Sequence, residues 1–146
     1  MKALVQRVSQ AAVDVEGDRV AQIGPGMVVL LGVGVGDTEV EGDRLAEKVR
    51  KLRIFDDAAG RMNEPLGERE VLCVSQFTLY GDARRGNRPS YTGAVRPEAA
   101  EPLYDRFCER LGAKKGVFGA CMGVALVNDG PVTLMLEVPP VVEPTA

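Results

Sequence analysis

Apolar and polar residues alternate with a period of two through the first third of the chain. Val13, Val15 and Val20 follow this alternation, and Glu16-Gly17-Asp18 between them is a turn signal. The pattern predicts strands joined by tight turns, over residues 2–9, 12–16, 19–24 and 27–34.

The period then changes to that of a helix. Thr38 and Glu41 have the spacing of a capping box. Beyond them, apolar residues recur at i, i+4 and i+7, at Leu45, Val49 and Leu52. These signals predict a helix over residues 39–53.

A second apolar stripe at helical spacing follows later, at Leu103, Phe107 and Leu111. Gly112 would end this helix, and Pro97 suits its first position. Pro102 would then lie inside the helix and cost a backbone hydrogen bond unless the first turn is irregular.

Other apolar segments predict the rest of a sheet. They are residues 70–79, 117–118, 122–127 and 132–138, the last two joined at Asn128-Asp129-Gly130. Residues 82–93, with their arginines, glycines and proline, are typical of a long loop. Together the elements predict a single α+β domain over residues 1–139, with an antiparallel sheet and two main helices. Residues 140–146 are expected to form a flexible tail.

Size and composition agree with one globular domain of 146 residues, 45% hydrophobic and 27% charged. The strongest apolar run, residues 27–35, is about half as long as a membrane-spanning helix requires. Polar residues at the start of the chain disfavour a signal peptide. We therefore expect a cytoplasmic protein that binds no membrane.

The three cysteines, Cys73, Cys108 and Cys121, are widely spaced among apolar neighbours, so we expect buried thiols of a reducing compartment. Histidine is absent from the chain. Its absence removes the commonest general base and disfavours a zinc site or a Ser-His-Asp or Cys-His nucleophile. No metal or cofactor is expected.

Ser75-Gln76-Phe77-Thr78 places three hydrogen-bonding side chains in an apolar, β-rich run. Two interpretations stay open on the residues alone. The segment is either a strand end whose hydroxyls bond to backbone, or a row of backbone N–H donors aimed at a developing oxyanion. Without histidine, neither hydroxyl has an ordinary activating base, which weakens a serine-hydrolase interpretation.

The segment Asn128 to Thr133 carries Asp-Gly between two apolar strands, which is a hairpin signal, and a surface turn is the simple interpretation. Gly130 before Pro131 keeps a cis peptide bond accessible.

Basic residues form three clusters in a chain of net charge −3. That net charge disfavours binding of an extended duplex or of DNA by bulk electrostatics. Each cluster is either a solvated surface or a local binding site for one end of an RNA. The clusters are Arg44, Lys48, Arg50, Lys51 and Arg53 on the first helix, Arg84, Arg85 and Arg88 in the loop, and Lys114-Lys115.

Taken together, several segments resemble the bacterial and eukaryotic D-aminoacyl-tRNA deacylase family over almost the whole chain. The pair Ser75-Gln76-Phe77-Thr78-Leu79 and Gly130-Pro131-Val132-Thr133, in this order and spacing, is highly specific. The other matching segments are Met1-Lys2-x-x-Val5-Gln6-Arg7-Val8, Lys51-Leu52-Arg53-Ile54-Phe55, Met62-Asn63, Gly86-Asn87-Arg88-Pro89-Ser90, Phe118-Gly119-Ala120-x-Met122 and Asn128.

The resemblance implies a barrel-like antiparallel subunit that forms a homodimer with two active sites at the interface. Gly130-Pro131, joined by a cis bond, would enter the partner's pocket beside its Ser75 to Thr78 segment. Two carbonyls would then exclude L-amino acids by a clash with Cβ. The implied substrate is the acceptor end of tRNA carrying a D-amino acid, or glycine, which has no Cβ.

The resemblance also implies roles for single residues. Backbone N–H groups around Phe77 and Thr78 would stabilise the oxyanion, and Gln76 would orient the ester. The Thr78 hydroxyl would position attack by water or the 2′-OH, and a nucleophilic Thr78 is the competing mechanism. Arg7 would support the incoming Gly130-Pro131 of the partner by hydrogen bonds to carbonyls. Further binding or supporting residues are Phe118, at the adenosine pocket, and Met122, Val132 and Thr133.

Two segments depart from the family pattern: residues 63–68 lack a serine and are short, and Cys121 and Gly123 flank Met122 where larger polar residues are usual. Both concern loop contacts with tRNA.

Three alternative functions remain. An animal relative that clears misacylated L-alanine is disfavoured by Ser75, whereas a non-catalytic RNA-binding barrel and a metabolite-binding oligomer stay open.

Overall fold

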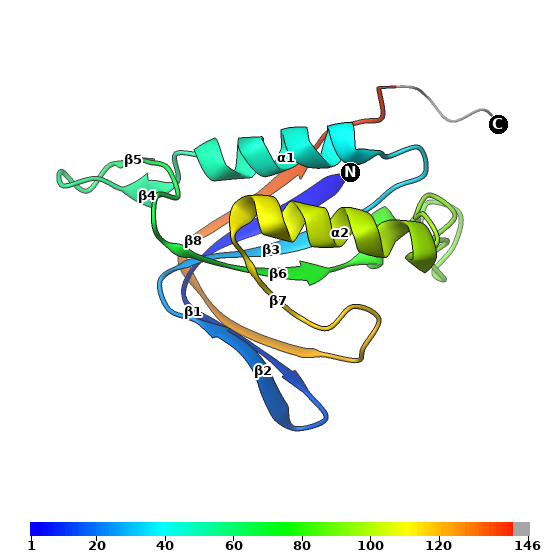
Figure 1. Cartoon of the computed structure of the whole chain (residues 1–146), viewed down its shortest axis with the longest axis horizontal. Coiled ribbons are helices and arrows are strands. Elements are labelled where there is room, and N and C mark those ends of the chain that lie inside the picture. Colours follow the sequence, from blue (N-terminus) through cyan, green and yellow to red (C-terminus); the bar gives the residue numbers. More distant parts are fainter. Residues whose placement is uncertain (142–146) are drawn as a thin grey trace.

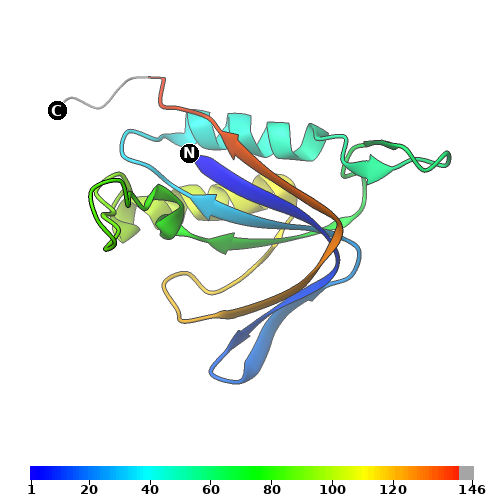
Figure 2. The same cartoon turned by 180° about the vertical axis from the view of Figure 1, so that it is seen from behind.

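The computed structural model describes residues 1–141 and shows a curved sheet with both helices packed on one face (Figure 1). Its central strand is β1 (Lys2–Val15), which pairs antiparallel with β3 (Gly26–Gly32) along its first half and with β2 (Asp18–Ile23) along its second half. β8 (Gly123–Glu137) pairs antiparallel with the other edge of β1. Seen from behind, β1 and β8 bend together, so that the sheet curls toward a barrel (Figure 2).

The sheet is mixed, so the expectation of a wholly antiparallel sheet is wrong. β6 (Glu70–Ser75) runs parallel to β3, and the short strand β7 (Lys114–Lys115) runs parallel to β6. Parallel neighbours need a crossover connection. Here the crossovers contain α1 (Glu39–Lys51) and α2 (Pro97–Leu111), which accounts for both helices.

The first predicted helix is confirmed, with its start at the predicted capping box. Val40 N–H donates to the Thr38 hydroxyl, and Thr38 N–H donates to the Glu41 carboxylate. The helix ends at Lys51, two residues earlier than expected.

The second predicted helix is also confirmed. Pro97 occupies its first turn, and Pro102 lies inside it. Gly112 ends it with φ of 62°, the left-handed conformation that glycine adopts without steric cost.

Two predicted breaks in the strands are wrong. β1 is continuous where two strands were expected, because β8 pairs along nearly its whole length. The hairpin at Asn128-Asp129-Gly130 is wrong as well. Gln6 lies opposite Thr133 and Val8 opposite Asn128, so both flanks pair with β1 in one direction and residues 129–132 form a bulge opposite Arg7.

The strand expected at residues 117–118 is also absent, and these residues belong to a loop before β8. Lys114 and Lys115 pair instead, opposite Leu72 and Cys73. The polar lysines concealed this short strand from an argument based on apolar runs.

The core has one part on each face of the sheet. Met27, Val29 and Leu31 face the helices, where they pack with Tyr104 and Phe107 among others. The alternate residues, such as Val28, pack on the opposite face with Val8, Val13, Ile23, Leu72 and Val74. This is the two-residue period that the sequence shows.

Cys73 and Cys108 are buried as predicted, but Cys121 is exposed, so that part of the prediction is wrong. Of the tail predicted over residues 140–146, residues 142–146 lie outside the described part. The N–H of Val141 donates to Glu41 (2.8 Å). Among residues 1–141, no helix is long and apolar enough to cross a membrane.

Candidate functional site

The end of β6 presents two unpartnered backbone donors. The strand stops at Ser75, and after Gln76 the chain makes one turn of 3₁₀ helix, η1 (Phe77–Tyr80). The first N–H groups of a helical turn have no partner within it. Within residues 1–141, the N–H groups of Phe77 and Thr78 meet no acceptor. Two adjacent donors are therefore free to bind an anionic oxygen.

The side chains around these donors are linked to each other. The Gln76 side-chain amide donates to the Thr78 hydroxyl. Thr78 is exposed and Gln76 half-buried, so the hydroxyl is oriented toward an accessible surface. Gln76 and Thr78 are therefore in direct contact at the end of β6, and the separate roles expected of them stay predictions.

A pocket of about 570 Å³ opens beside the end of β6. This volume lies in the usual range for small-ligand sites. Ser75, Gln76 and Phe77 form one part of its lining, and Phe118 and Met122 form another. The remaining lining residues are Val33, Val74, Tyr91, Ala94, Val95, Arg96, Pro97, Ala100, Gly119, Ala120 and Val124.

The lining contains neither a carboxylate, nor a histidine, nor a cysteine among the described residues, and Arg96 is its one charged side chain there. These walls therefore offer hydrogen-bond donors and apolar surface, but no ordinary general base. A reaction in this pocket would depend on the positioning of the reacting groups and on the stabilisation of negative charge in the transition state.

Phe118 and Met122 are positioned by packing against neighbouring residues. The Phe118 ring packs against Tyr104 at a centroid distance of 5.8 Å, and the Tyr104 hydroxyl donates to the Cys73 carbonyl (2.7 Å). Burial raises the pKa of Tyr104, so this hydroxyl stays protonated. A Cβ on Gly116 would lie 2.7 Å from the Met122 sulfur, so glycine at this turn lets Met122 pack closely.

A second cluster surrounds Arg7, which is 8% exposed. Its Nη1 donates to the Ile54 carbonyl (2.7 Å) and its Nε to the Asp129 carbonyl (3.3 Å). Its guanidinium also pairs with the carboxylates of Asp56 (3.4 Å) and Asp129 (3.1 Å). The bond that follows, Gly130-Pro131, is cis. Arg7 thus contacts the bulge of its own chain through the Asp129 carbonyl, and its support of a partner's incoming Gly130-Pro131 stays a prediction.

Asn128 closes the base of the bulge. Its side-chain amide donates to the carbonyls of Arg7 and Val132, both at 3.0 Å. The Thr133 hydroxyl in turn donates to the Asn128 side chain (3.2 Å). Val132 and Thr133 therefore belong to the base of this bulge.

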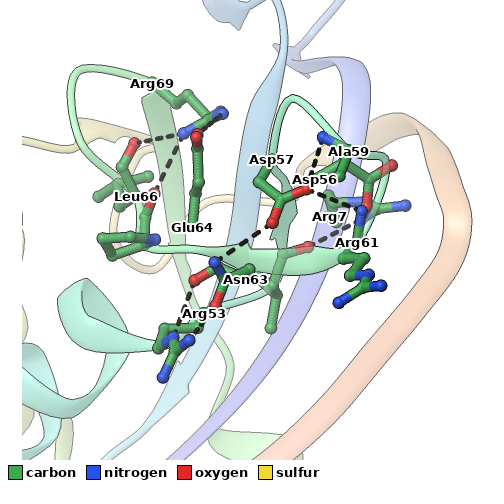
Figure 3. A network of polar contacts seen from close by, with 12 residues as sticks. Arg7, Arg53, Asp56, Asp57, Ala59, Arg61, Asn63, Glu64, Leu66 and Arg69 are labelled. Carbon is green, nitrogen blue, oxygen red and sulfur yellow. Dashed lines mark hydrogen bonds and ion pairs between the residues drawn. The ribbon is translucent and has the colours of Figure 1, made fainter.

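The hairpin of β4 (Phe55–Asp56) and β5 (Met62–Glu64) lies against Arg7 (Figure 3). Asp57 accepts from the N–H groups of Ala59 (2.9 Å) and Arg61 (3.0 Å). Figure 3 also shows Arg53 donating to Asn63, which links the hairpin to the end of α1. The Arg61 N–H, with the other donors, holds the pKa of Asp57 below its usual range.

Comparison with known proteins decides the family. The family model described as D-Tyr-tRNA(Tyr) deacylase matches residues 4–137. This chain belongs to that family. It is 58% identical to a D-aminoacyl-tRNA deacylase of Myxococcus xanthus (strain DK1622), over 95% of each chain. It is 56% identical to the same-named protein of Symbiobacterium thermophilum, over 94% of this chain and 95% of that one.

Two solved structures share the fold of this chain. The structure of a c-Myc DNA Unwinding Element Binding Protein has a TM-score of 0.90 and 42% identity, covering 95% of this chain and 99% of that one. A probable eukaryotic D-amino acid tRNA deacylase has a TM-score of 0.81 at 18% identity, covering 94% and 98%, and shows the shared fold. The resemblance drawn from the motifs is confirmed.

Within this deacylase-family chain, the predicted residues fall into two separate groups. Ser75, Gln76, Phe77, Phe118 and Met122 line the pocket, with Thr78 next to it. None of the lining residues in the described chain comes from the bulge. The bulge group consists of Arg7, Gly130, Pro131, Val132 and Thr133.

Sequence reasoning missed the wall that the loop before α2 contributes to the pocket. Tyr91 and Arg96 belong to it. An aromatic residue within a predicted loop of arginine, glycine and proline was an available signal. Asp56 and Ile54, the partners of Arg7, gave no signal because they are distant in sequence.

Proposed function

We propose that this chain is a D-aminoacyl-tRNA deacylase, which hydrolyses the ester between a D-amino acid and the 3′ end of tRNA. Family membership supports the activity, since the curated relatives carry that name. The structural observation that carries the mechanism is the pair of free N–H groups at Phe77 and Thr78, beside a pocket whose lining in residues 1–141 contains no carboxylate, histidine or cysteine.

An aminoacyl ester is already activated, so correct placement supplies much of the acceleration. Water, or water assisted by the neighbouring 2′-OH, attacks the ester carbonyl. The two N–H groups stabilise the oxyanion, which collapses and expels the ribose oxygen, and that oxygen takes up the proton. Gln76 and Thr78 orient the ester end and the attacking group, while Phe118 and Met122 hold the terminal adenosine.

The homodimer is part of the same proposal, because Gly130-Pro131 lies outside the pocket of its own chain. Residues 1–141 provide no strand for the outer edge of β8. That strand exposes Val127, Leu134 and Met135, by 48%, 37% and 52%. An exposed apolar edge strand is a template for pairing with another chain. A second copy would bring Gly130-Pro131 into each pocket.

Chiral proofreading follows from that arrangement. The carbonyls of the partner's Gly130-Pro131 would clash with the Cβ of an L-amino acid, whereas a D-side chain points outward. Glycine has no Cβ, so Gly-tRNA should also be hydrolysed. Within residues 1–141, the pocket lining holds no carboxylate, histidine or cysteine that could bind a metal, and we expect chelators to leave the rate of hydrolysis unchanged.

The test removes one backbone donor. Phe77 is the first residue of η1, where proline is well tolerated and where the lost N–H has no partner. Phe77→Pro should therefore fold but lose about 10²–10³-fold in single-turnover hydrolysis of D-Tyr-tRNA. Phe77→Leu keeps the N–H and removes the ring, and is the matched control.

Equal rates for the proline and leucine variants would exclude the oxyanion role of this N–H. A wild-type protein that binds tRNA but never hydrolyses D-Tyr-tRNA would instead support the non-catalytic RNA-binding alternative.

A further inference from the structure

The loop before α2 carries an uncompensated positive charge. Residues 82–96 contain four arginines and one acidic residue, a net charge of +3 in a chain of net charge −3. Arg84 is bound by Asp82 (2.8 Å), whose pKa this partner lowers to about 2. Arg85, Arg88 and Arg96 are exposed and meet no carboxylate within 4.0 Å in residues 1–141.

The other basic clusters are at least partly neutralised. Lys114 pairs with Glu70 (2.9 Å) and Lys115 with Asp105 (3.2 Å). On α1, Lys51 pairs with Glu47. Of the clusters that the sequence shows, the arginine loop is therefore the one that combines free cations with near neighbours in the chain, Tyr91 and Arg96, that line the pocket.

An aromatic pair stands between this loop and the pocket. The rings of Phe77 and Tyr91 meet edge to face at a centroid distance of 5.1 Å and an interplanar angle of 73°. Both are unusually accessible for aromatic residues, at 55% and 38% exposure. The exposure of both rings leaves aromatic surface accessible to a ligand at the mouth of the pocket.

Backbone hydrogen bonds fix the loop next to the Phe77–Tyr91 pair. Asp82 and Ser90 bond to each other through both backbone N–H groups, each at 2.8 Å, which closes residues 82–90 into a hairpin directly before Tyr91. Arg88 is three residues from Tyr91, so their Cα atoms lie within about 11 Å. In Figure 1 this loop folds back beside the start of α2, at the end of the sheet where η1 lies.

We propose that Tyr91 and the free arginines Arg85 and Arg88 form a clamp for the single-stranded 3′ end of tRNA. A base of the unpaired end stacks on Tyr91, and the guanidinium groups bind the phosphates that follow. Aromatic stacking beside a basic track is the general design of single-strand binding. This inference rests on the proposed function, because it assigns the path by which that substrate reaches the pocket.

A single strand fits these features better than a duplex. The uncompensated positive charge of this loop is confined to residues 82–96, whereas a duplex needs an extended basic surface. An exposed aromatic face also gains little from paired and stacked bases. The clamp would explain how a chain of net negative charge binds RNA locally.

Binding of uncharged RNA tests the clamp without any hydrolysis. We would measure the binding affinity of the protein for two RNAs by fluorescence anisotropy at several salt concentrations. One RNA is a hairpin with a four-nucleotide 3′ overhang, and the other is the same hairpin with a blunt end. Tyr91→Ala should weaken overhang binding by about 5- to 150-fold, and Tyr91→Phe should retain it. Arg85→Gln with Arg88→Gln should lower the slope of log K against log salt by about 0.7 per arginine.

Arg44→Gln is the matched control, because Arg44 is exposed and lies on α1, outside the pocket lining. It should bind the overhang like the wild type, and thermal melting confirms that each variant is folded. Overhang affinity unchanged in Tyr91→Ala and in the double arginine variant would overturn the clamp, as would equal losses on the blunt hairpin. Hydrolysis of D-Tyr-tRNA by the wild type tests the proposed function separately.

Discussion

The guanidinium of Arg7 lies so close to Gly130 that a Cβ atom added to Gly130 would be 2.8 Å from Arg7 Nη2. The same atom would be 2.9 Å from the Val132 side chain, and Gly130 has φ of +114°, which side-chain-bearing residues rarely adopt. Because Arg7 also bonds to Ile54 and Asp129, the position of the bulge depends on glycine at this site.

Gly130→Ala should therefore displace the bulge and weaken discrimination between D- and L-substrates. We expect the ratio of single-turnover rates on D-Tyr-tRNA and L-Tyr-tRNA to fall at least about tenfold, which corresponds to about 1.4 kcal/mol. Gly17→Ala is the control, because Gly17 has φ of +82° but a Cβ atom added there would meet no other atom within 4 Å. An unchanged ratio in Gly130→Ala would remove the bulge from chiral selection.

Thr78 distinguishes positioning from covalent catalysis. If its hydroxyl only positions the attack, Thr78→Ser should be nearly silent, and Thr78→Ala should lose one hydrogen bond of about 0.5–1.5 kcal/mol, or about tenfold in rate. The measurement is single-turnover hydrolysis of D-Tyr-tRNA on one tRNA preparation. A Thr78→Ala rate near background, with an acyl-enzyme trapped on the wild type, would identify Thr78 as the nucleophile.

A mixed dimer tests whether each site takes residues from two chains. Gly130→Ala should hydrolyse D-Tyr-tRNA with weakened discrimination, whereas Phe77→Pro should be slow at both sites of its dimer. A purified mixed dimer has one site with both segments intact, so it should show about half of the wild-type rate on D-Tyr-tRNA and the wild-type ratio of D- to L-rates. A ratio as low as that of Gly130→Ala alone would show that both segments act within one chain.

Glu41 makes the stability of the fold depend on pH. Burial alone would raise the pKa of this 1% exposed carboxyl. The Thr38 hydroxyl and the N–H groups of Val141 and Thr38 outweigh that effect, and they lower the pKa from 4.5 to about 2. Because the folded-state pKa is depressed, the carboxylate contributes stability above pH 4.5 and loses it as the pH falls toward 2.

Glu41→Gln should consequently lower Tm most at about pH 6–7, and the difference from the wild type should shrink below about pH 4. Thermal unfolding followed by circular dichroism across this range measures it. A constant difference in Tm at every pH would mean that Glu41 acts through packing and not through its charge.

The sequence by itself determined the features that depend on near neighbours. The capping box at Thr38 and Glu41, the start of α2 at Pro97 and its end at Gly112 are all confirmed, because a helix end is satisfied by residues within one turn of it. The paired motifs at Ser75 and Gly130 were enough to identify the family. The missing histidine weakened a serine-hydrolase interpretation, while the roles of Phe77 and Thr78 are implied by the family resemblance and stay predictions.

Only the tertiary structure decided what depends on distant partners. An N–H in a strand bonds to whichever strand lies beside it, and alternation along one strand does not encode the direction of its neighbour. β6 is therefore parallel to β3, and the turn signal at Asn128 to Gly130 became a bulge because both flanks pair with β1. The same long-range pairing separates Gly130 from the pocket of its own chain, since the bulge lies opposite Arg7 while the pocket forms at the end of β6.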